Sequence, residues 1–358
     1  MRPSNTIADI TTEYPETAGH TLSPLTRLVH DIFHLKFGEQ LILPERRMNA
    51  LRRVLDCGSG NCSWALDVAR QYPNCEVHGV DISPIMMPFG LPSNLFLYQC
   101  DLNDEIPYPD NHFDFVHSRL VDGGVNSDRW VPYIREMKRV LVRRGWVQMV
   151  EIYFNAQSFN GSFNDLPDGG ALRQWSSHYL GAMRRLGKNP AIGMRLGDML
   201  TASGFVEVEA QSFNLPMCAW SNESQLAAYN QYNVAELLHS LALWPLTARP
   251  GGLRMTIDEF DRLVGNARVE ASNPNLKTVV VGSHISKWMS YVAVGRLVAC
   301  QDLEDGDSKP LAPSVGSGSL FKVYAELGSK LESAILSYLG VLGSSQLGPV
   351  HSTTPAMS

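Results

Sequence analysis

The sequence predicts an α/β protein with a doubly wound, mostly parallel sheet of seven strands. Between residues 51 and 154, apolar runs typical of buried strands alternate with stretches of helical spacing. This is the pattern of a parallel sheet with helices on both faces. A glycine-rich turn follows the first apolar run, and acidic residues close the first three runs. Because such folds bind ligands at the carboxyl ends of their strands, the same features predict where a ligand binds.

The predicted elements follow one another in a regular order. Strands are expected at 54–56, 77–81, 94–99, 113–117, 146–154, 204–213 and 291–297, with a turn at Arg144-Gly145 before the fifth of them. Helices are expected at 63–71, 130–142 and 194–203. The last two strands are separated by about 75 residues, whereas a hairpin needs only about 2–5, so we expect an insertion between them.

The chain divides into a main domain and several flanking segments. Residues 51–300 form the main domain, and its insertion at about 215–288 is expected to be a helical lid with helices at 224–246 and 256–267. The other segments are a mobile N-terminus (1–20), a helical cap (21–50), a linker (301–319), an amphipathic helix (320–342) and a disordered tail (343–358). The amphipathic helix either packs on its own domain or contacts a second copy or a partner protein.

The turn after the first strand has the pattern of a ligand-binding loop. Gly58 and Gly60 let the backbone turn sharply and approach a ligand, at which the amides of the next helix then point. A dinucleotide loop would have a third glycine where this chain has Ser63. Asp56 favours a ligand with a positive end, and S-adenosylmethionine (SAM) carries both an ammonium and a sulfonium group. The loop, centred on Ser59, therefore predicts a SAM site, and a purely structural turn is the alternative.

Acidic residues at the next two strand ends suit a nucleoside. Asp81 lies 25 positions after Asp56, close to the ~20-residue offset of a ribose-binding carboxylate. Asp101 follows the third strand and is placed to accept a hydrogen bond from the adenine amino group. Ile82 and Leu102, the next residues in each case, are predicted to contact the cofactor too. Each acid by itself also fits a solvated loop position.

Three residues are candidates for a general base that removes a proton from a methyl acceptor. They are His117 at the end of the fourth strand, Glu151 in the fifth, and His178 in the segment after it. Histidine suits the role because its free pKa is ~6.5, and a well-placed base contributes roughly 10²–10⁴-fold. Alternatively, His117 packs or contacts adenine, Glu151 is structural or contacts the amino acid end of the cofactor, and His178 is an ordinary surface or core histidine.

Composition narrows the classes of partner. A net charge of −6 over 358 residues gives no broad basic surface for nucleic acid. The six cysteines include no C-x-x-C pair, and no metal cluster is evident. The N-terminus lacks the apolar core of a signal peptide, and no apolar stretch approaches the ~20 residues that span a membrane. We therefore expect a small-molecule acceptor as partner, neither nucleic acid nor membrane, and a cytoplasmic location, with the nucleus as the alternative.

The chain resembles the class I SAM-dependent methyltransferases, and among them the LaeA-type methyltransferases of fungal secondary metabolism. Besides the glycine loop, the resemblance runs through residues 27–33, 41–44, 80–84, 92–95, 108–119, 200–206 and 291–297. By position, Gly58, Gly60, Asp81, Asp101 and His117 match family residues that line the cofactor site. The chain departs from the family pattern at Asn61-Cys62 and at Arg143-Arg144-Gly145, which replaces the usual proline-glycine-glycine turn.

The resemblance implies a methyltransferase that uses SAM to methylate an oxygen or a nitrogen of a small secondary metabolite. Aromatic residues are dense between residues 153 and 244, which suits a hydrophobic acceptor. The leading alternative is a LaeA-like nuclear regulator that works through partner proteins. A further alternative is a methyltransferase fold that binds SAM but no longer turns it over.

Overall fold

The computed structural model describes residues 24–42, 51–83, 90–220, 224–247, 252–281 and 290–297. These residues all belong to one compact unit, residues 1–300. The predictions for segments 1–20, 301–319, 320–342 and 343–358 lie outside the described residues. The described part of the predicted cap contains helix α1 (Pro24–Lys36).

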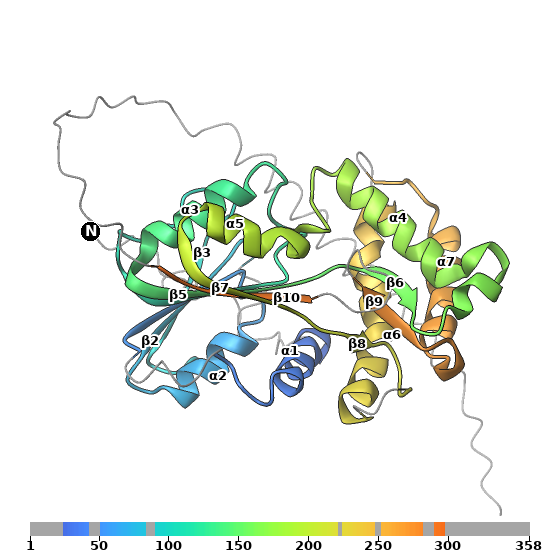
Figure 1. Ribbon diagram of the computed structural model, residues 1–358, viewed down its shortest axis with the longest axis horizontal. Helices are drawn as coiled ribbons and strands as arrows, with labels where there is room; N and C mark the ends of the chain where they lie inside the picture. Colours follow the sequence, from blue (N-terminus) through green and yellow to red (C-terminus); the bar gives the residue numbers. More distant parts are fainter. Residues whose placement is uncertain are drawn as a thin grey trace, which may run out of the picture. The chain divides into compact units, whose positions relative to one another are not determined.

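The main sheet has seven strands in the order β3-β2-β1-β4-β5-β10-β7 (Figure 1). Strands β1 to β5 run parallel to one another. Strand β10 lies between β5 and β7 and runs antiparallel to both. The strand order reverses between β1 and β4, and doubly wound sheets bind ligands at such a switch point. The strands are β1 (Arg53–Cys57), β2 (Glu76–Asp81), β3 (Leu95–Gln99), β4 (Phe113–Arg119), β5 (Leu141–Ile152), β7 (Phe205–Ser212) and β10 (Ser290–Leu297).

Helices cover both faces of this sheet. Helices α1 and α2 (Ser63–Gln71) lie on one face, and α3 (Trp130–Val140) and α5 (Leu196–Ala202) on the other (Figure 1). Successive side chains of a strand point to opposite faces, so each central strand contributes to two separate cores. Val54, Phe115 and Val150 belong to the core beneath α1 and α2, and Leu55, Val116 and Val147 to the core beneath α3 and α5.

A helical part with its own small sheet adjoins the carboxyl ends of the strands. It contains α4 (Ala171–Arg185), α6 (Ser224–Thr247) and α7 (Ile257–Ala271), together with strands β6 (Asn155–Ser158), β8 (Leu215–Pro216) and β9 (Thr278–Val281) in the order β6-β9-β8. Short 3₁₀ helices occur at Ser162–Asp165, Pro167–Gly169, Ile192–Arg195 and Pro274–Leu276. The apolar side chains of this part continue the core beneath α1 and α2.

The helical part extends beyond the insertion predicted at about 215–288. The insertion does contain two helices, but they pack against α4, and β9 pairs with β6. Both α4 and β6 precede the sixth predicted strand. The physical reason is burial: Trp175 and Tyr179 of α4 are 1% and 2% exposed, which requires the apolar faces of α6 and α7. The helical part is therefore assembled from two separate stretches of chain.

Two strand boundaries also differ from the prediction. Strand β5 begins at Leu141, so the predicted turn at Arg144-Gly145 lies inside the strand, where Arg144 has a φ of 66° and the pairing with β4 shifts register. Three extra residues of β5 are accommodated there as a bulge. Strand β4 continues to Arg119, which places His117 inside the strand.

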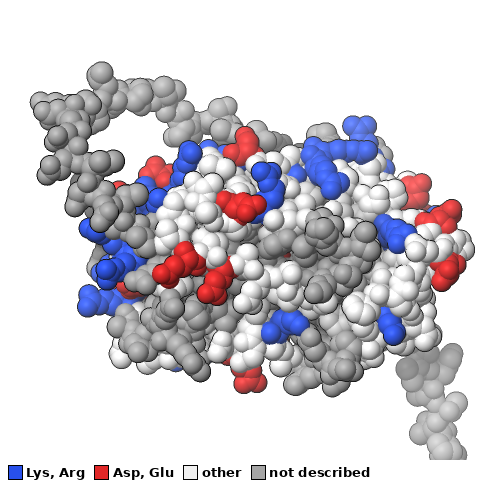
Figure 2. All heavy atoms as spheres, viewed as in Figure 1, with Lys and Arg blue, Asp and Glu red and all other residues white. Residues whose placement is uncertain are grey.

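Charged side chains do not gather by sign on the face shown in Figure 2. Basic and acidic residues both occur across its described part, and neither forms a continuous surface. Among the described residues, no helix has the length and apolar character to cross a membrane.

The start of α4 depends on a carboxylate from α7. Glu270 accepts hydrogen bonds from the backbone N–H groups of Ala171 and Leu172, each at 2.8 Å. Helix α4 has no side-chain cap of its own, and the first amides of a helix need such acceptors. A side chain at Gly170 would lie 2.7 Å from the Glu270 carboxylate. Glu270 therefore joins the two stretches of the helical part.

We predict that Glu270→Ala lowers the free energy of unfolding by about 1.5–3 kcal/mol, the range for hydrogen bonds to a charged group. Urea unfolding monitored by tryptophan fluorescence measures the change. Glu236→Ala is the matched control, because Glu236 lies on neighbouring α6 and its side chain is 65% exposed. Equal stability of the two variants would contradict the capping role.

Candidate functional site

The glycine loop after β1 has the backbone geometry of a binding loop. Gly58 and Gly60 have φ values of 73° and 53°, in the left-handed region that favours glycine. A Cβ at Gly58 would lie 2.4 Å from Val121 Cγ1, so the close packing of the loop on the segment after β4 requires glycine there. No atom of the described residues lies within 4 Å of the Cβ position of Gly60. The loop is thus packed on one side and open on the other.

Asp81 at the end of β2 fixes this loop. Its Oδ2 accepts the Gly60 N–H at 2.8 Å and its Oδ1 accepts the Ser83 N–H at 2.9 Å. Burial raises the pKa of Asp81, and these backbone N–H groups partly offset the rise. A carboxylate oxygen accepts more than one hydrogen bond, so each oxygen retains an acceptor position for a ribose hydroxyl. The predicted cofactor role of Asp81 thus comes with a structural one.

The neighbouring strand ends supply an apolar face and a second acid. Ile82 is 52% exposed, although it is a large apolar residue. Asp101 accepts hydrogen bonds from Asn103 N at 2.9 Å and from Asn103 Nδ2 at 2.7 Å, both on Oδ1. Leu102 is buried and packs beside Gly58. The loop, Asp81, Ile82 and Asp101 together fit a nucleoside, with Ile82 as a surface for the base.

Asp56, the acid before the glycines, is buried in a pair with His117. Asp56 Oδ1 and His117 Nδ1 are 2.7 Å apart, and both residues are 2% exposed. The His117 ring stacks on Trp64 with centroids 3.8 Å apart. Burial lowers the pKa of His117, and Asp56 opposes that shift. His117, which lies within β4, therefore acts as a hydrogen-bond partner that positions Asp56 of β1. The role of His117 as a general base stays a prediction.

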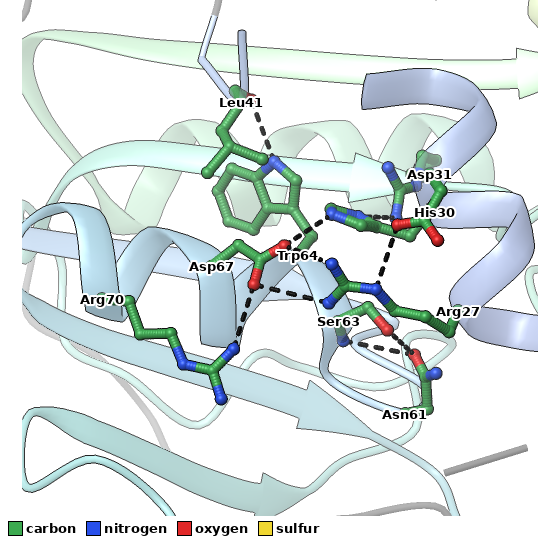
Figure 3. A network of polar contacts seen from close by, with 10 residues as sticks. Arg27, His30, Asp31, Leu41, Asn61, Ser63, Trp64, Asp67 and Arg70 are labelled. Carbon is green, nitrogen blue, oxygen red and sulfur yellow. Dashed lines mark hydrogen bonds and ion pairs between the residues drawn. The ribbon is translucent and has the colours of Figure 1, made fainter. Parts of the chain in front are cut away.

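A polar network ties α1 to this region (Figure 3). His30 is 1% exposed, and its Nε2 lies 3.0 Å from Asp67 Oδ2 on α2. Arg27 and Arg70 also contact Asp67, at 3.1 and 3.3 Å. Burial by itself would raise the pKa of Asp67, but His30 and Arg27 outweigh it and lower the pKa to about 2. The network holds α1 beside the glycine loop.

Arg119 extends the network to the end of β4. Its Nη2 donates to His30 Nδ1 at 3.2 Å, and its guanidinium lies 5.1 Å from the centre of the Phe33 ring. Burial lowers the pKa of Arg119 to about 10. Within the described residues, Arg119 forms no ion pair with a carboxylate, and it lines a hollow together with His117 and Gln148. A guanidinium in this setting fits a carboxylate, and the methionine part of SAM carries one.

An apolar hollow lies between α1, the ends of β4 and β5, and the helical part. Its empty volume is about 460 Å³, part of it open to solvent. Residues lining it include Phe33, Leu120, Ile152, Phe154, Met217 and Val280. Leu120 has a φ of 56°, a strained value for a bulky residue that tends to mark functional sites. Apolar pockets with few polar groups are typical of small-molecule sites.

On the opposite face of β5, Glu151 forms a buried pair of acids with Asp122. Glu151 is 1% exposed and accepts the backbone N–H groups of Val121 and Asp122 at 2.9 and 3.4 Å. Burial raises the pKa of Asp122 to about 7. Burial, and secondly repulsion from Asp122, raise the pKa of Glu151 well above its ordinary value. Tyr179 of α4 lies close enough for both acids to raise its pKa, after burial.

The predicted site residues thus separate into groups. The structure brings the loop, Asp81, Ile82, Asp101 and Leu102 to one edge of the sheet. It puts Glu151 with Asp122, and it leaves His178 half-buried on α4, with no side-chain hydrogen bond among the described residues. Among the described residues, no three metal-binding side chains come together.

Several residues of the site were missed by sequence reasoning. Asp122 stands directly before two glycines after a strand, which is the same signal that singled out Asp56, and it was detectable. His30, Asp67 and Tyr179 carry no such signal, because their partners are distant in sequence.

Comparisons with known proteins support the interpretation of the glycine loop as part of a methyltransferase. A family model described as a methyltransferase domain matches residues 54–145. The chain is 31% identical over 260 residues to a protein of Monascus pilosus named secondary metabolism regulator laeA, an alignment that covers 69% of this chain and 66% of the relative. It is 29% identical over 258 residues to a protein-methionine methyltransferase laeA of Emericella nidulans, covering 69% and 65%. The chain therefore spans just under two thirds of these relatives.

Solved structures give a looser likeness. Phosphoethanolamine N-methyltransferase 2 of Haemonchus contortus, in complex with S-adenosyl-L-methionine, is 15% identical with a TM-score of 0.43, over 80% of this chain and 62% of that one. A likeness at this level supports no argument about activity.

We predict that Asp81→Asn weakens the binding of S-adenosylhomocysteine on the order of 10- to 100-fold, equivalent to about 1.5–3 kcal/mol for hydrogen bonds to a charged group. Isothermal titration calorimetry measures the affinity. Asp198→Asn, at an exposed position of α5, is the control and leaves the affinity unchanged. Unaltered affinity in Asp81→Asn would remove Asp81 from the site.

The acid pair predicts a pH dependence of stability. The Asp122 pKa is about 7 in the folded state and 3.8 ordinarily, so the folded state binds the proton more tightly than the unfolded state. The resulting stabilisation is complete below pH 4 and is lost as the pH rises towards 7, and Glu151 acts in the same direction. Asp122→Asn should therefore flatten the fall in melting temperature between pH 5 and pH 8. A slope equal to that of the wild type and of Asp198→Asn would contradict the buried pair.

Proposed function

Because the chain belongs to the LaeA-type class I SAM-dependent methyltransferases, we propose that it transfers a methyl group from SAM to an oxygen or nitrogen of a small secondary metabolite. The observation that carries the cofactor half of this proposal is the Gly60–Asp81 contact at 2.8 Å, which holds an open glycine loop beside a carboxylate. The apolar hollow beside Phe33 and Leu120 supports the acceptor half.

The residues around the loop would each do a separate task. Asp81 accepts hydrogen bonds from the ribose, Ile82 faces the adenine, and Arg119 pairs with the cofactor carboxylate. When bound, SAM supplies an electrophilic methyl group on a sulfonium. Holding acceptor and methyl group aligned supplies roughly 7–11 kcal/mol of the barrier reduction. The apolar walls of the hollow would orient the acceptor.

A second candidate function follows from the names of the relatives. The protein of Monascus pilosus is named a regulator of secondary metabolism and that of Emericella nidulans a protein-methionine methyltransferase. On this reading, the chain acts through a protein partner or on a protein side chain, and its location is nuclear. The metabolite reading places it in the cytoplasm. The apolar lining of the hollow favours a small apolar acceptor.

Radiolabelled SAM separates the two functions. The purified protein and the labelled cofactor are incubated in two parallel reactions. One contains a low-molecular-mass extract and the other a protein extract of a fungus that makes secondary metabolites. We expect label in the organic-soluble fraction. Label confined to protein would favour the second function. S-adenosylhomocysteine binding by calorimetry, with no label transferred in either extract, would leave a protein that binds the cofactor without turnover.

A further inference from the structure

The buried acids at the ends of β4 and β5 have a feature that the cofactor site does not explain. Asp122 is 6% exposed, and its Oδ2 has no hydrogen-bond partner within the described part of the chain. A buried polar atom without a partner is costly, and most such atoms in native proteins have one. The Asp122 carboxyl therefore retains a position for a ligand atom.

No cation of the described residues neutralises this pair. The charge of Lys188 does act on Asp122, since it lowers the pKa of that carboxyl group against the larger effect of burial. However, its Nζ donates to the Gly124 carbonyl oxygen at 2.6 Å and to Asn126 Oδ1 at 2.7 Å, and it forms no ion pair with Asp122. Two adjacent carboxyl groups without a counterion favour a positively charged ligand.

The pair lies beside the glycine loop, on the face of β5 opposite the residues that line the apolar hollow. Val121, which precedes Asp122, packs directly on Gly58. On the other side, the Tyr179 ring next to the acids contacts the Phe154 ring, with centroids 6.0 Å apart, and Phe154 lines the hollow. The buried rings of Phe154 and Tyr179 thus stand between the hollow and the acids, and an acceptor whose apolar body lies in the hollow would have to pass beside them to reach Asp122.

We propose that the carboxyl groups of Asp122 and Glu151 bind the basic nitrogen of the methyl acceptor, and that this acceptor is an amine with an apolar body. The inference rests on the proposed function and specifies its substrate class. Asp122 makes the direct contact through Oδ2. Glu151, which is anchored on the Val121 and Asp122 N–H groups, holds the loop and Asp122 in place. Tyr179 covers the pair from α4.

The proton and electron balance needs no further reactant. An amine enters as an ammonium ion and displaces the carboxyl proton of Asp122 to solvent. The resulting carboxylate then accepts one proton of the ammonium ion, which frees the nitrogen lone pair. That lone pair forms the new N–C bond while the C–S bond of the cofactor breaks, and the bonding electrons stay on sulfur. The positive charge thereby passes from sulfur to nitrogen, and the proton held by Asp122 then leaves to solvent, which restores a carboxylate beside the methylated ammonium group.

Calorimetry with matched probes tests the inference. The wild-type protein, saturated with S-adenosylhomocysteine, is titrated at pH 6 with tryptamine and tryptophol, phenethylamine and 2-phenylethanol, and octylamine and octanol. Each amine is compared with the alcohol of the same shape. We expect at least one amine to bind at least tenfold more tightly than its alcohol. Because burial raises the pKa of both acids, we expect amine binding to release a proton, detected as a difference in heat between phosphate and Tris buffers.

Variants identify the site of the preference. Asp122→Asn should abolish both the amine preference and the proton release while S-adenosylhomocysteine still binds. Asp198→Asn should retain both. Equal binding of amine and alcohol in every pair, no binding of any probe, or a preference that survives Asp122→Asn would overturn the inference. Loss of S-adenosylhomocysteine binding in the wild type would instead overturn the proposed function, so the two failures are distinguishable.

Discussion

The hydrogen bond from the Gly60 N–H to Asp81 Oδ2, at 2.8 Å, is the contact on which the cofactor site depends. It joins the ends of β1 and β2 and holds the glycine loop in its left-handed conformation. The second fixed point is Gly58, where only the absence of a side chain allows Val121 to pack against the loop. These two contacts place the segment after β4, and with it Leu120 and Asp122, relative to the cofactor loop.

The buried carboxyl groups around that loop have two different kinds of partner. On the α1 and α2 face, Asp56 has His117 and Asp67 has His30 and two arginines, so each carboxylate has a partner. On the other face of the sheet, the described residues offer Asp122 and Glu151 only backbone N–H groups and each other. An unpaired buried charge costs far more than a paired one. We infer from this contrast that Asp56 and Asp67 stabilise the fold, whereas Asp122 and Glu151 bind a ligand.

Sequence reasoning found the parts of the site that are local in the chain. The glycines and the acids at strand ends are read from a few consecutive residues, since strand, turn and helix follow directly there. Contacts between distant residues were beyond it: His30 and Arg119 are 89 positions apart, and Glu270 caps a helix that begins 99 positions earlier. The helical part was misjudged for the same reason, because α4 meets α6 and α7 only through tertiary packing. Asp122 was overlooked although its local pattern resembled that of Asp56.

A crystal structure of the protein with S-adenosylhomocysteine tests the central claim most directly. The account predicts the two ribose hydroxyls on the Asp81 carboxylate, the adenine against Ile82, and the homocysteine sulfur directed towards the hollow beside Leu120. Density for the nucleoside at any other edge of the sheet, or an Asp81 side chain that holds the loop without touching the ribose, would contradict it.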